Sequence, residues 1–259
     1  MIALKYMSII GGEPAYWFLK RFYPGGTGIP MVDYDPFKAR GISKLAHYFG
    51  KDIFEKLRDK TVIDFGCGTG DNAIECAMNG CRDVIGLDIQ EHFLEKGRAE
   101  AARLGVAGRV KFVQVATEKA DVVLSTDAFE HFEDPAHILR IMRGLLKDDG
   151  YLQVEFGYTW YHPLGGHLFS VFPWAHLLFT EEALIRWRTD FKTDGATRFH
   201  EVAGGLNRMT LGRWEKLVEE SPFRFESYKL RPIRAARWLH CKLTKELFTS
   251  TICARLVPK

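Results

Sequence analysis

The chain has 259 residues, of which 46% are hydrophobic and 27% are charged. These proportions are those of an ordinary globular protein, and they exclude collagen-like, coiled-coil and wholly disordered chains. The formal net charge of +3 is too small to indicate a nucleic-acid partner by itself.

The first 59 residues predict a helical arm. Aromatic residues gather between Tyr16 and Tyr23, just before a Pro-Gly-Gly turn. From Pro36 to Leu57, apolar residues recur at spacings of three and four, which predicts a helix. The N-terminus lacks the long apolar stretch and cleavage site of a signal peptide. We expect residues 1–59 to form part of a cap rather than a separate domain.

Between Lys60 and Gly157, predicted strands and helices alternate with short loops. The strands are expected at 61–65, 83–88, 110–115, 121–125 and 151–156, and the helices at 72–78, 91–104 and 135–146. This alternation predicts an α/β fold, a doubly wound and mostly parallel sheet with helices on both faces.

Residues 158–210 break this alternation. The stretch 157–180 holds no Asp, Glu, Lys or Arg and is long enough to cross a bilayer. Two prolines and a glycine pair would interrupt a membrane-spanning helix, so no transmembrane segment is expected. We expect a cap insertion over the carboxyl edge of the sheet, with one helix at 181–188.

Residues 211–259 are expected to complete the core sheet. A helix is predicted at 211–220 and strands at 223–230 and 250–257, with an antiparallel strand closing one edge. Between these strands lies a basic amphipathic stretch, 233–248. A solvated helix face is the preferred interpretation, and contact with an anionic surface such as lipid is the alternative.

The motif that points to chemistry follows the first core strand, where Gly66, Gly68 and Gly70 alternate before a helix. Glycine allows sharp turns and a close approach to a ligand, and a helix start offers free N–H groups. The dinucleotide fingerprint would need glycine where Asp71 stands, and this carboxylate would repel a pyrophosphate. Asp88 ends the next strand, where a carboxylate can accept the hydroxyl protons of a ribose. The pattern therefore predicts a nucleoside ligand with a ribose diol and no phosphate beside the glycines.

These motifs resemble those of the class I S-adenosylmethionine-dependent methyltransferases. That family has an acidic residue followed by G-x-G-x-G after strand one, here Asp64 to Gly70, and an acidic residue ending strand two, here Asp88. The segment 124–132 resembles the small-molecule "type 11" branch. The resemblance covers about residues 60–157 well and 211–257 loosely. It implies a seven-stranded Rossmann-like sheet with S-adenosylmethionine as cofactor and S-adenosylhomocysteine as product. It also implies methyl transfer to an O, N or C nucleophile of a small molecule.

The resemblance also implies roles for individual residues. Gly66 and Gly68 would line the methionine and sugar, Asp64 would approach the methionine amino group, and Asp88 would hold the ribose hydroxyls. Many relatives carry a Gly-Asp-Ala-type segment after strand three, and here Val113–Glu118 stands in its place. The expected cofactor-contacting residues are Asp64, Gly66, Cys67, Gly68, Gly70, Asp88, Ile89, Ala116 and Thr117.

Candidate acceptor residues follow strands four and five. His131 can serve as a general base near neutral pH, or it can cap the strand-four loop. The catalytic candidates are His131, Tyr158 and His162, and the substrate-binding candidates are Glu130, Tyr161, His167 and Asn207. For Asn207 a plain turn is an equal alternative. We expect the acceptor pocket under 158–210, because this charge-free stretch would exclude water.

Several other classes of function are weighed against this one. His162, His167 and His176 lack the spacing of a helical metal pair, and the five cysteines form no C-x-x-C motif, so no metal site is predicted. Reduced cysteines indicate the cytoplasm. The strand-four segment 125–128 lacks the Asn/Asp-Pro-Pro-aromatic motif of methyltransferases that act on nucleic-acid bases. A non-catalytic cofactor-binding protein and an enzyme acting on a lipid at a membrane surface stay open as alternatives, and the sequence does not fix the oligomeric state.

Overall fold

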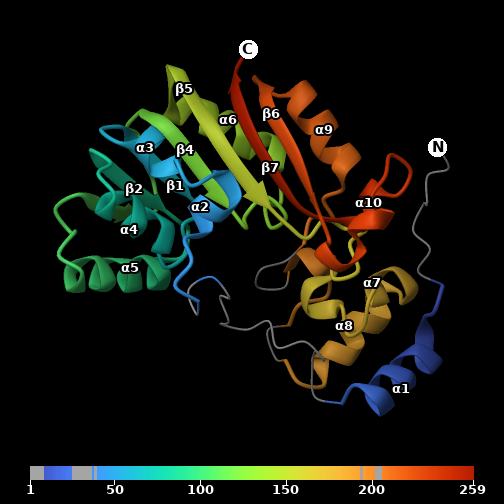
Figure 1. The fold of residues 1–259 in the computed structure, drawn as a ribbon. Coiled ribbons are helices and arrows are strands. Elements are labelled where there is room, and N and C mark those ends of the chain that lie inside the picture. The colour runs from blue at the N-terminus through green and yellow to red at the C-terminus, as the bar shows by residue number, and fades with distance from the viewer. Residues whose placement is uncertain (1–8, 25–36, 38–39, 193–194, 202–205) are drawn as a thin grey trace.

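A seven-stranded sheet with helices on both faces forms the larger part of the molecule, and a helical cap lies beyond one edge of it (Figure 1). This computed structural model describes residues 9–24, 37, 40–192, 195–201 and 206–259. The strand order is β3-β2-β1-β4-β5-β7-β6. The strands are β1 (Thr61–Phe65), β2 (Asp83–Leu87), β3 (Val110–Val113), β4 (Ala120–Thr126), β5 (Leu146–Phe156), β6 (Phe223–Pro232) and β7 (Thr249–Pro258).

The first five strands are parallel, as their sequence predicts, but the antiparallel strand does not close the sheet. β7 lies between β5 and β6 and runs antiparallel to both of them. β7 is buried over Thr251–Ala254 without interruption, which is typical of a central strand. β6 is half-buried or exposed at every position except Phe223, which suits an edge. The expectation of an antiparallel edge strand is therefore wrong by one position.

Two layers of helices bury the two faces of the sheet. One face carries α2 (Lys44–Phe49), α3 (Ile53–Leu57), α4 (Asp71–Met78) and α5 (Glu91–Arg103), around a core that includes Ile74, Leu94 and Phe112. The other face carries α6 (Pro135–Leu145) and α9 (Leu211–Glu220), around Leu139 and Trp214. Successive strand residues point to opposite faces, so Val62 joins the first core and Ile63 the second.

The N-terminal arm is divided between the two parts of the molecule. α1 (Gly12–Phe22) packs on α8 of the cap, and the Tyr16 hydroxyl donates to the Asp190 carboxylate at 3.0 Å. α2 and α3 pack on the sheet instead. The expected single helix from Pro36 to Leu57 is wrong, because Gly50 (φ +108°) ends α2 and α3 begins three residues later. Pro36 itself lies outside the described residues.

The cap has a hydrophobic core of its own. Its elements are η2 (His167–Phe169), α7 (Ala175–Leu178), α8 (Glu181–Thr189) and η3 (Phe199–Glu201). Trp187, Leu184 and Phe169 are buried there together with Leu19 of α1. Trp160 N–H donates to the Met209 carbonyl at 2.7 Å, which links the two ends of the cap segment.

The interpretation of the basic stretch 233–248 as a solvated helix face requires a helix over this stretch. The structure shows no single helix there. The stretch forms η4 (Arg234–Leu239) and α10 (Lys245–Phe248), with a turn between them. Because β6 runs parallel to β5, this segment emerges at the same edge as the carboxyl ends of the parallel strands. Figure 1 shows α10 on the side of the sheet that faces the cap.

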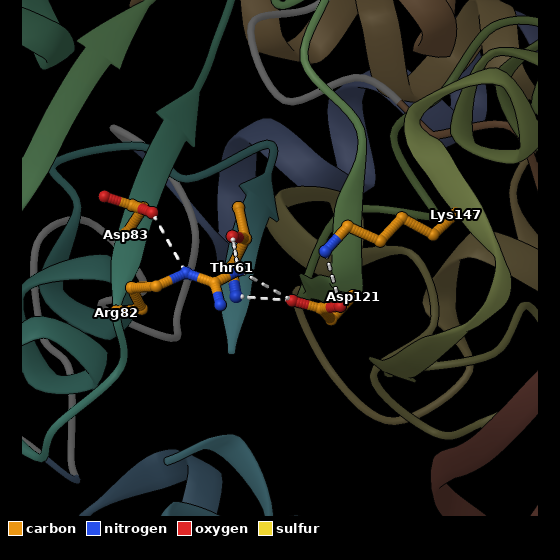
Figure 2. Close-up of polar contacts among 5 residues, drawn as sticks. All are labelled: Thr61, Arg82, Asp83, Asp121 and Lys147. Carbon is orange, nitrogen blue, oxygen red and sulfur yellow. Dashed lines mark hydrogen bonds and ion pairs between the residues drawn. The ribbon is translucent and has the colours of Figure 1, made fainter. Parts of the chain in front are cut away.

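A polar network fastens the opposite, amino edge of the sheet (Figure 2). The Asp121 carboxylate at the start of β4 accepts from the Thr61 backbone N–H and from the Lys147 ammonium, both at 2.7 Å. Arg82 reaches the same carboxylate at 3.4 Å and the Thr61 hydroxyl at 2.7 Å. Burial opposes ionisation of Asp121, but Lys147, the Thr61 N–H and Arg82 together outweigh it, and the pKa lies below its usual value. The network joins four strand starts and leaves the carboxyl edge open for a site.

No helix in the described part of the chain is long and apolar enough to span a membrane. Within those same residues, no group of three or more His, Cys, Asp or Glu side chains is arranged to hold a metal ion.

Candidate cofactor and acceptor site

The glycine loop after β1 adopts the conformation that its sequence predicts. Gly66, Gly68 and Gly70 have φ angles of +76°, +51° and +78°, a region that other residues rarely adopt. The N–H groups of Gly66 and Cys67 donate to the Leu87 carbonyl at 2.8 and 3.0 Å. The loop is therefore fixed to the end of β2, where Asp88 follows.

Two of these glycines serve different physical purposes. A Cβ atom on Gly70 would lie 2.2 Å from the Phe112 ring, so this glycine makes room for a core side chain. Gly86 and Gly97 border the same ring, with Cβ positions at 2.5 and 2.9 Å. A Cβ atom on Gly68 would meet nothing within 4 Å. Gly68 thus presents bare backbone to an open space, where a ligand can approach.

Asp88 lies directly beside this space. One of its carboxylate oxygens accepts from the Gly68 N–H and the other from the Gln90 N–H, each at 2.9 Å. A carboxylate oxygen has two lone pairs, so both can still accept from a ribose hydroxyl. Next to Asp88, the Ile89 side chain is 82% exposed, and across from it Val115 is 76% exposed. The Gln114 side chain donates to the Ile89 carbonyl and joins these two segments.

The remaining cofactor candidates lie around the same loop. The Cys67 thiol contacts the Gly68 carbonyl at 3.6 Å, and burial raises its pKa above the usual range. Ala116 packs against the core. Thr117 is exposed, and its N–H donates to the Glu118 carboxylate at 3.2 Å.

Asp64 is a buried acid below the glycine loop. Its side chain is 1% exposed, and one carboxylate oxygen has no hydrogen-bond partner among the described residues. Burial raises the pKa of Asp64 to about 7, although Lys44 and the Ala73 N–H act in the opposite direction. A buried carboxyl group with an unused oxygen is stabilised by a cation placed beside it.

Charged residues gather near Asp64, and among them sequence reasoning assigned a role only to Glu130, as a substrate-binding candidate. Lys44 of α2 pairs with Asp127 at 2.7 Å, and Asp127 follows β4. Glu130 and Glu155 are buried, and each leaves one carboxylate oxygen without a partner in the described structure. Burial raises the pKa of both glutamates, and Asp127 adds to the effect. The carboxyl ends of β1, β4 and β5 therefore form an acidic floor of carboxyl groups, and Lys44 places a positive charge beside it.

The acceptor candidates from two distant segments do come together. The His131 ring lies 5.4 Å from the His167 ring, and the Tyr158 ring stacks on His162 at 4.0 Å. Tyr158 also meets His167 edge-on at 6.1 Å. The loop after β4 and the start of the cap thus build one cluster of histidine and tyrosine rings.

His162 is buried and His167 is half-buried, and the two differ in what their nitrogens can do. His162 Nδ1 accepts from the Leu164 N–H at 2.9 Å, so the neutral ring carries its proton on Nε2 and has no lone pair left for a base. His167 bonds to the Tyr158 backbone through its other nitrogen, and its Nε2 has no partner among the described residues. Burial lowers the pKa of His162 to about 4 and that of His167 to about 3, so both rings are neutral at physiological pH.

The other substrate-binding candidates are engaged in holding the loops. The Asn207 side-chain amide donates to the carbonyls of Phe129 and Phe132 at 2.6 and 2.8 Å, which clamps the loop after β4. Only its oxygen is left without a partner in the described structure. The Tyr161 carbonyl accepts from the Trp174 indole at 2.9 Å.

Comparison with known proteins bears directly on this arrangement. A family model described as a methyltransferase domain matches residues 56–162. The chain is 39% identical over 101 residues to a ubiquinone biosynthesis O-methyltransferase from Neisseria meningitidis. The aligned region covers 36% of this chain and 42% of the relative. It is 35% identical over 100 residues to a ribosomal protein L11 methyltransferase from Pasteurella multocida, covering 37% of this chain and 33% of the relative. Residues 56–162 form a class I S-adenosylmethionine-dependent methyltransferase domain. The chain spans less than half the length of these curated relatives.

The methyltransferase domain also agrees with solved structures. A structure described as an S-adenosylmethionine-dependent methyltransferase from Listeria monocytogenes superposes with a TM-score of 0.52 and 18% identity, over 80% of this chain and 96% of that one. This likeness confirms the predicted Rossmann-like fold, and the family match confirms the predicted cofactor.

The residues of the methyltransferase domain fit S-adenosylmethionine. The backbone at Gly68 borders open space, Asp88 has unused lone pairs beside it, and Asp64 offers a buried oxygen without a partner. The cofactor carries a ribose diol and a positively charged methionine portion, which match the acceptor and acidic groups of this edge.

Proposed function

We propose that this protein transfers a methyl group from S-adenosylmethionine to an O, N or C nucleophile on a small-molecule acceptor. The observation that carries the proposal is the glycine loop, where Gly68 exposes bare backbone to open space and donates to Asp88. Gly105 is also left-handed and borders open space, so what distinguishes Gly68 is its hydrogen bond to the Asp88 carboxylate at the end of β2.

Each part of the cofactor has a proposed partner. Asp88 would hold the ribose hydroxyls, and Asp64 would balance the methionine amino group. The exposed side chain of Ile89 would pack on the adenine, with Ala116 and Thr117 at its edge. When bound, the cofactor supplies a methyl group on a positively charged sulfonium. Burial raises the pKa of Glu130 and Glu155, and a positive charge at this edge would favour their ionised forms.

The acceptor is proposed to enter between the loop after β4 and the cap. There His167 Nε2 has no partner among the described residues, so it can accept a hydrogen bond from the nucleophile and orient it. His131 lies beside His167 and is the proposed proton acceptor. Tyr158 and His162 stack on each other and would form a wall of the pocket. The catalytic work of the chain is then positioning, removal of one proton and exclusion of water.

Two variants test the cofactor part of the proposal. Asp88→Ala removes the acceptors for two ribose hydroxyls, and we expect at least tenfold weaker binding of S-adenosylhomocysteine by calorimetry. Gly68→Val places a branched side chain in the open space, and we expect binding to be lost while the circular dichroism spectrum is unchanged. Unchanged affinity in Asp88→Ala would overturn the ribose assignment.

The acceptor part is tested by turnover. S-adenosylhomocysteine release is measured over a panel of phenols, amines and carboxylic acids, with purified wild type and with His131→Ala. We expect release with at least one acceptor class and a loss of about 10²–10⁴ in rate for the variant. Cofactor binding without release on any member would favour the alternative of a non-catalytic binding protein.

We also propose that the protein works in the cytoplasm. The five cysteines are free thiols, and those of Cys76 and Cys81 lie within hydrogen-bond reach of each other without forming a disulfide. Cell fractionation with an antibody against the protein tests this placement.

A further inference from the structure

The segment 233–245 carries an unusual combination of exposed side chains. Trp238 is 82% exposed and Leu243 is 93% exposed, far more than the large apolar residues around them. Arg234, Arg237 and Lys242 are also exposed. The segment contains no Asp or Glu.

Within the described residues these three cations have no ion-pair partner. Lys245 pairs with Glu215 at 3.1 Å, and Arg231 donates to the carbonyls of His47 and Tyr48. By contrast, no ion pair to Arg234, Arg237 or Lys242 is found in the part of the chain that the structure describes. A solvated helix face does not explain the segment, because η4 and α10 are short and the two apolar side chains point into solvent.

The segment is held firmly at its base, although its tip is exposed. The Ile233 N–H donates to the Phe248 carbonyl at 2.9 Å, which closes the loop between β6 and β7. The Phe248 ring lies 6.4 Å from the Trp174 ring of the cap. In Figure 1, α10 lies on the same side of the molecule as α1 and the cap, away from α4 and α5. The segment therefore projects from the edge of the sheet that carries the proposed site.

We propose that segment 233–245 docks this edge of the protein onto an anionic membrane surface. Trp238 and Leu243 would enter the boundary between headgroups and acyl chains, where tryptophan is favoured. Arg234, Arg237 and Lys242 would meet the negative headgroups, each adding to the attraction. An anionic surface complements the segment better than a nucleic acid does, because Leu243 offers nothing to a phosphate backbone or to a base stack.

The test measures vesicle binding, so it is independent of methyl transfer and of the proposed function. Wild-type protein is sedimented with phosphatidylcholine vesicles that contain or lack phosphatidylglycerol. We expect binding only to the phosphatidylglycerol vesicles, and we expect added salt to weaken it. Equal binding to both vesicles, or binding to neither, would overturn the proposal.

Matched variants locate the contact. Trp238→Ser with Leu243→Ser, and Arg237→Gln with Lys242→Gln, are each expected to weaken binding roughly tenfold or more. Lys96→Gln with Arg140→Gln makes the same change of charge on α5 and α6, and Met78→Ser removes an exposed apolar side chain from α4, away from the segment. These controls should bind as the wild type does, and all variants should keep its thermal unfolding temperature because the changed residues are exposed. Loss of binding in the controls, or none in the segment variants, would refute the assignment. If the wild type bound an acidic peptide but no vesicle, the partner of the segment would instead be a protein.

Discussion

At the scale of single residues, the glycine motif combines two requirements that the sequence does not separate. A side chain added at Gly68 would enter the open space where a ligand can approach, whereas one added at Gly70 would clash with the Phe112 ring. Both have positive φ angles, so both resist replacement, but only one replacement meets a steric clash. The family motif is therefore partly a packing motif.

This difference can be measured with two alanine variants. Gly68→Ala should lower the free energy of unfolding by about 1–2 kcal/mol, the cost of a left-handed alanine. Gly70→Ala should lower it by roughly 3 kcal/mol or more, since the added carbon also displaces a buried ring. Denaturant unfolding checks both values, and calorimetry should show weakened cofactor binding for Gly68→Ala. Equal destabilisation by the two variants would contradict the packing role of Gly70.

Asp64 should link cofactor binding to pH. Its pKa of about 7 in the free protein means that the carboxyl group is largely protonated at pH 6. A bound cation favours the carboxylate and lowers this pKa, so binding should release a proton and tighten as the pH rises from 6 to 7.5. Calorimetry of S-adenosylhomocysteine binding in two buffers of different ionisation enthalpy measures the release. Asp64→Asn should bind more weakly and lose this proton release, and a release that persists in the variant would assign it to another group.

At the scale of elements, the parallel half of the sheet could be predicted almost completely. Each of β1 to β5 was expected from an apolar run followed by a turn, and α9 was expected at its observed bounds. The arrangement of β6 and β7 could not be predicted, because the neighbours of a strand depend on hairpin pairing rather than on its own pattern. Of the acidic floor only Glu130 was expected at the site, and the part of Lys44 escaped prediction because it reaches the floor from a helix far away in the sequence.

The loop after β4 depends on a single side chain of the cap segment. Asn207 donates to two carbonyls of that loop, and the Asn207 N–H donates to the Glu130 carbonyl at 2.9 Å. Its expected role toward substrate stays a proposal, but its position also fixes His131. We infer that this clamp, rather than His131 alone, sets the shape of the acceptor site.

The clamp predicts how two substitutions at Asn207 rank in their free energy of unfolding. Asn207→Ala leaves two carbonyls without donors and should lower the free energy of unfolding by about 1–3 kcal/mol. Asn207→Asp keeps the size but turns an oxygen toward each carbonyl, so we expect it to destabilise at least as much. Denaturant unfolding compares the two, and turnover should fall in both while cofactor affinity changes little. An aspartate variant as stable as the wild type would refute the clamp.

At the scale of the whole molecule, the cap and the sheet have separate hydrophobic cores and respond to acid in opposite directions. His162, His167 and His176 all belong to the cap, and burial lowers their pKa values to about 4, 3 and 4. At the site edge of the sheet, burial raises the pKa values of Asp64, Glu130 and Glu155. The histidines therefore take up protons on unfolding, whereas these acids take them up on folding.

Acidification from pH 7 to pH 5 should consequently loosen the cap while the sheet persists. Over this interval each buried histidine is neutral in the folded cap and becomes charged in the unfolded segment, which costs stability as the pH falls below about 6.5. The slope is at most about 1.4 kcal/mol per pH unit for each histidine. Buried acids with raised pKa values contribute with the opposite sign, because the folded protein already holds their protons.

Amide hydrogen exchange measured by mass spectrometry should therefore rise in α7 and α8 at pH 5.5 and stay slow in β1 and β4. His176→Gln should reduce the pH dependence in the cap, and His137→Ala, a change at an exposed position on α6, should leave it unaltered. If the strands and the cap gained exchange together as the pH fell, the two cores would be one cooperative unit.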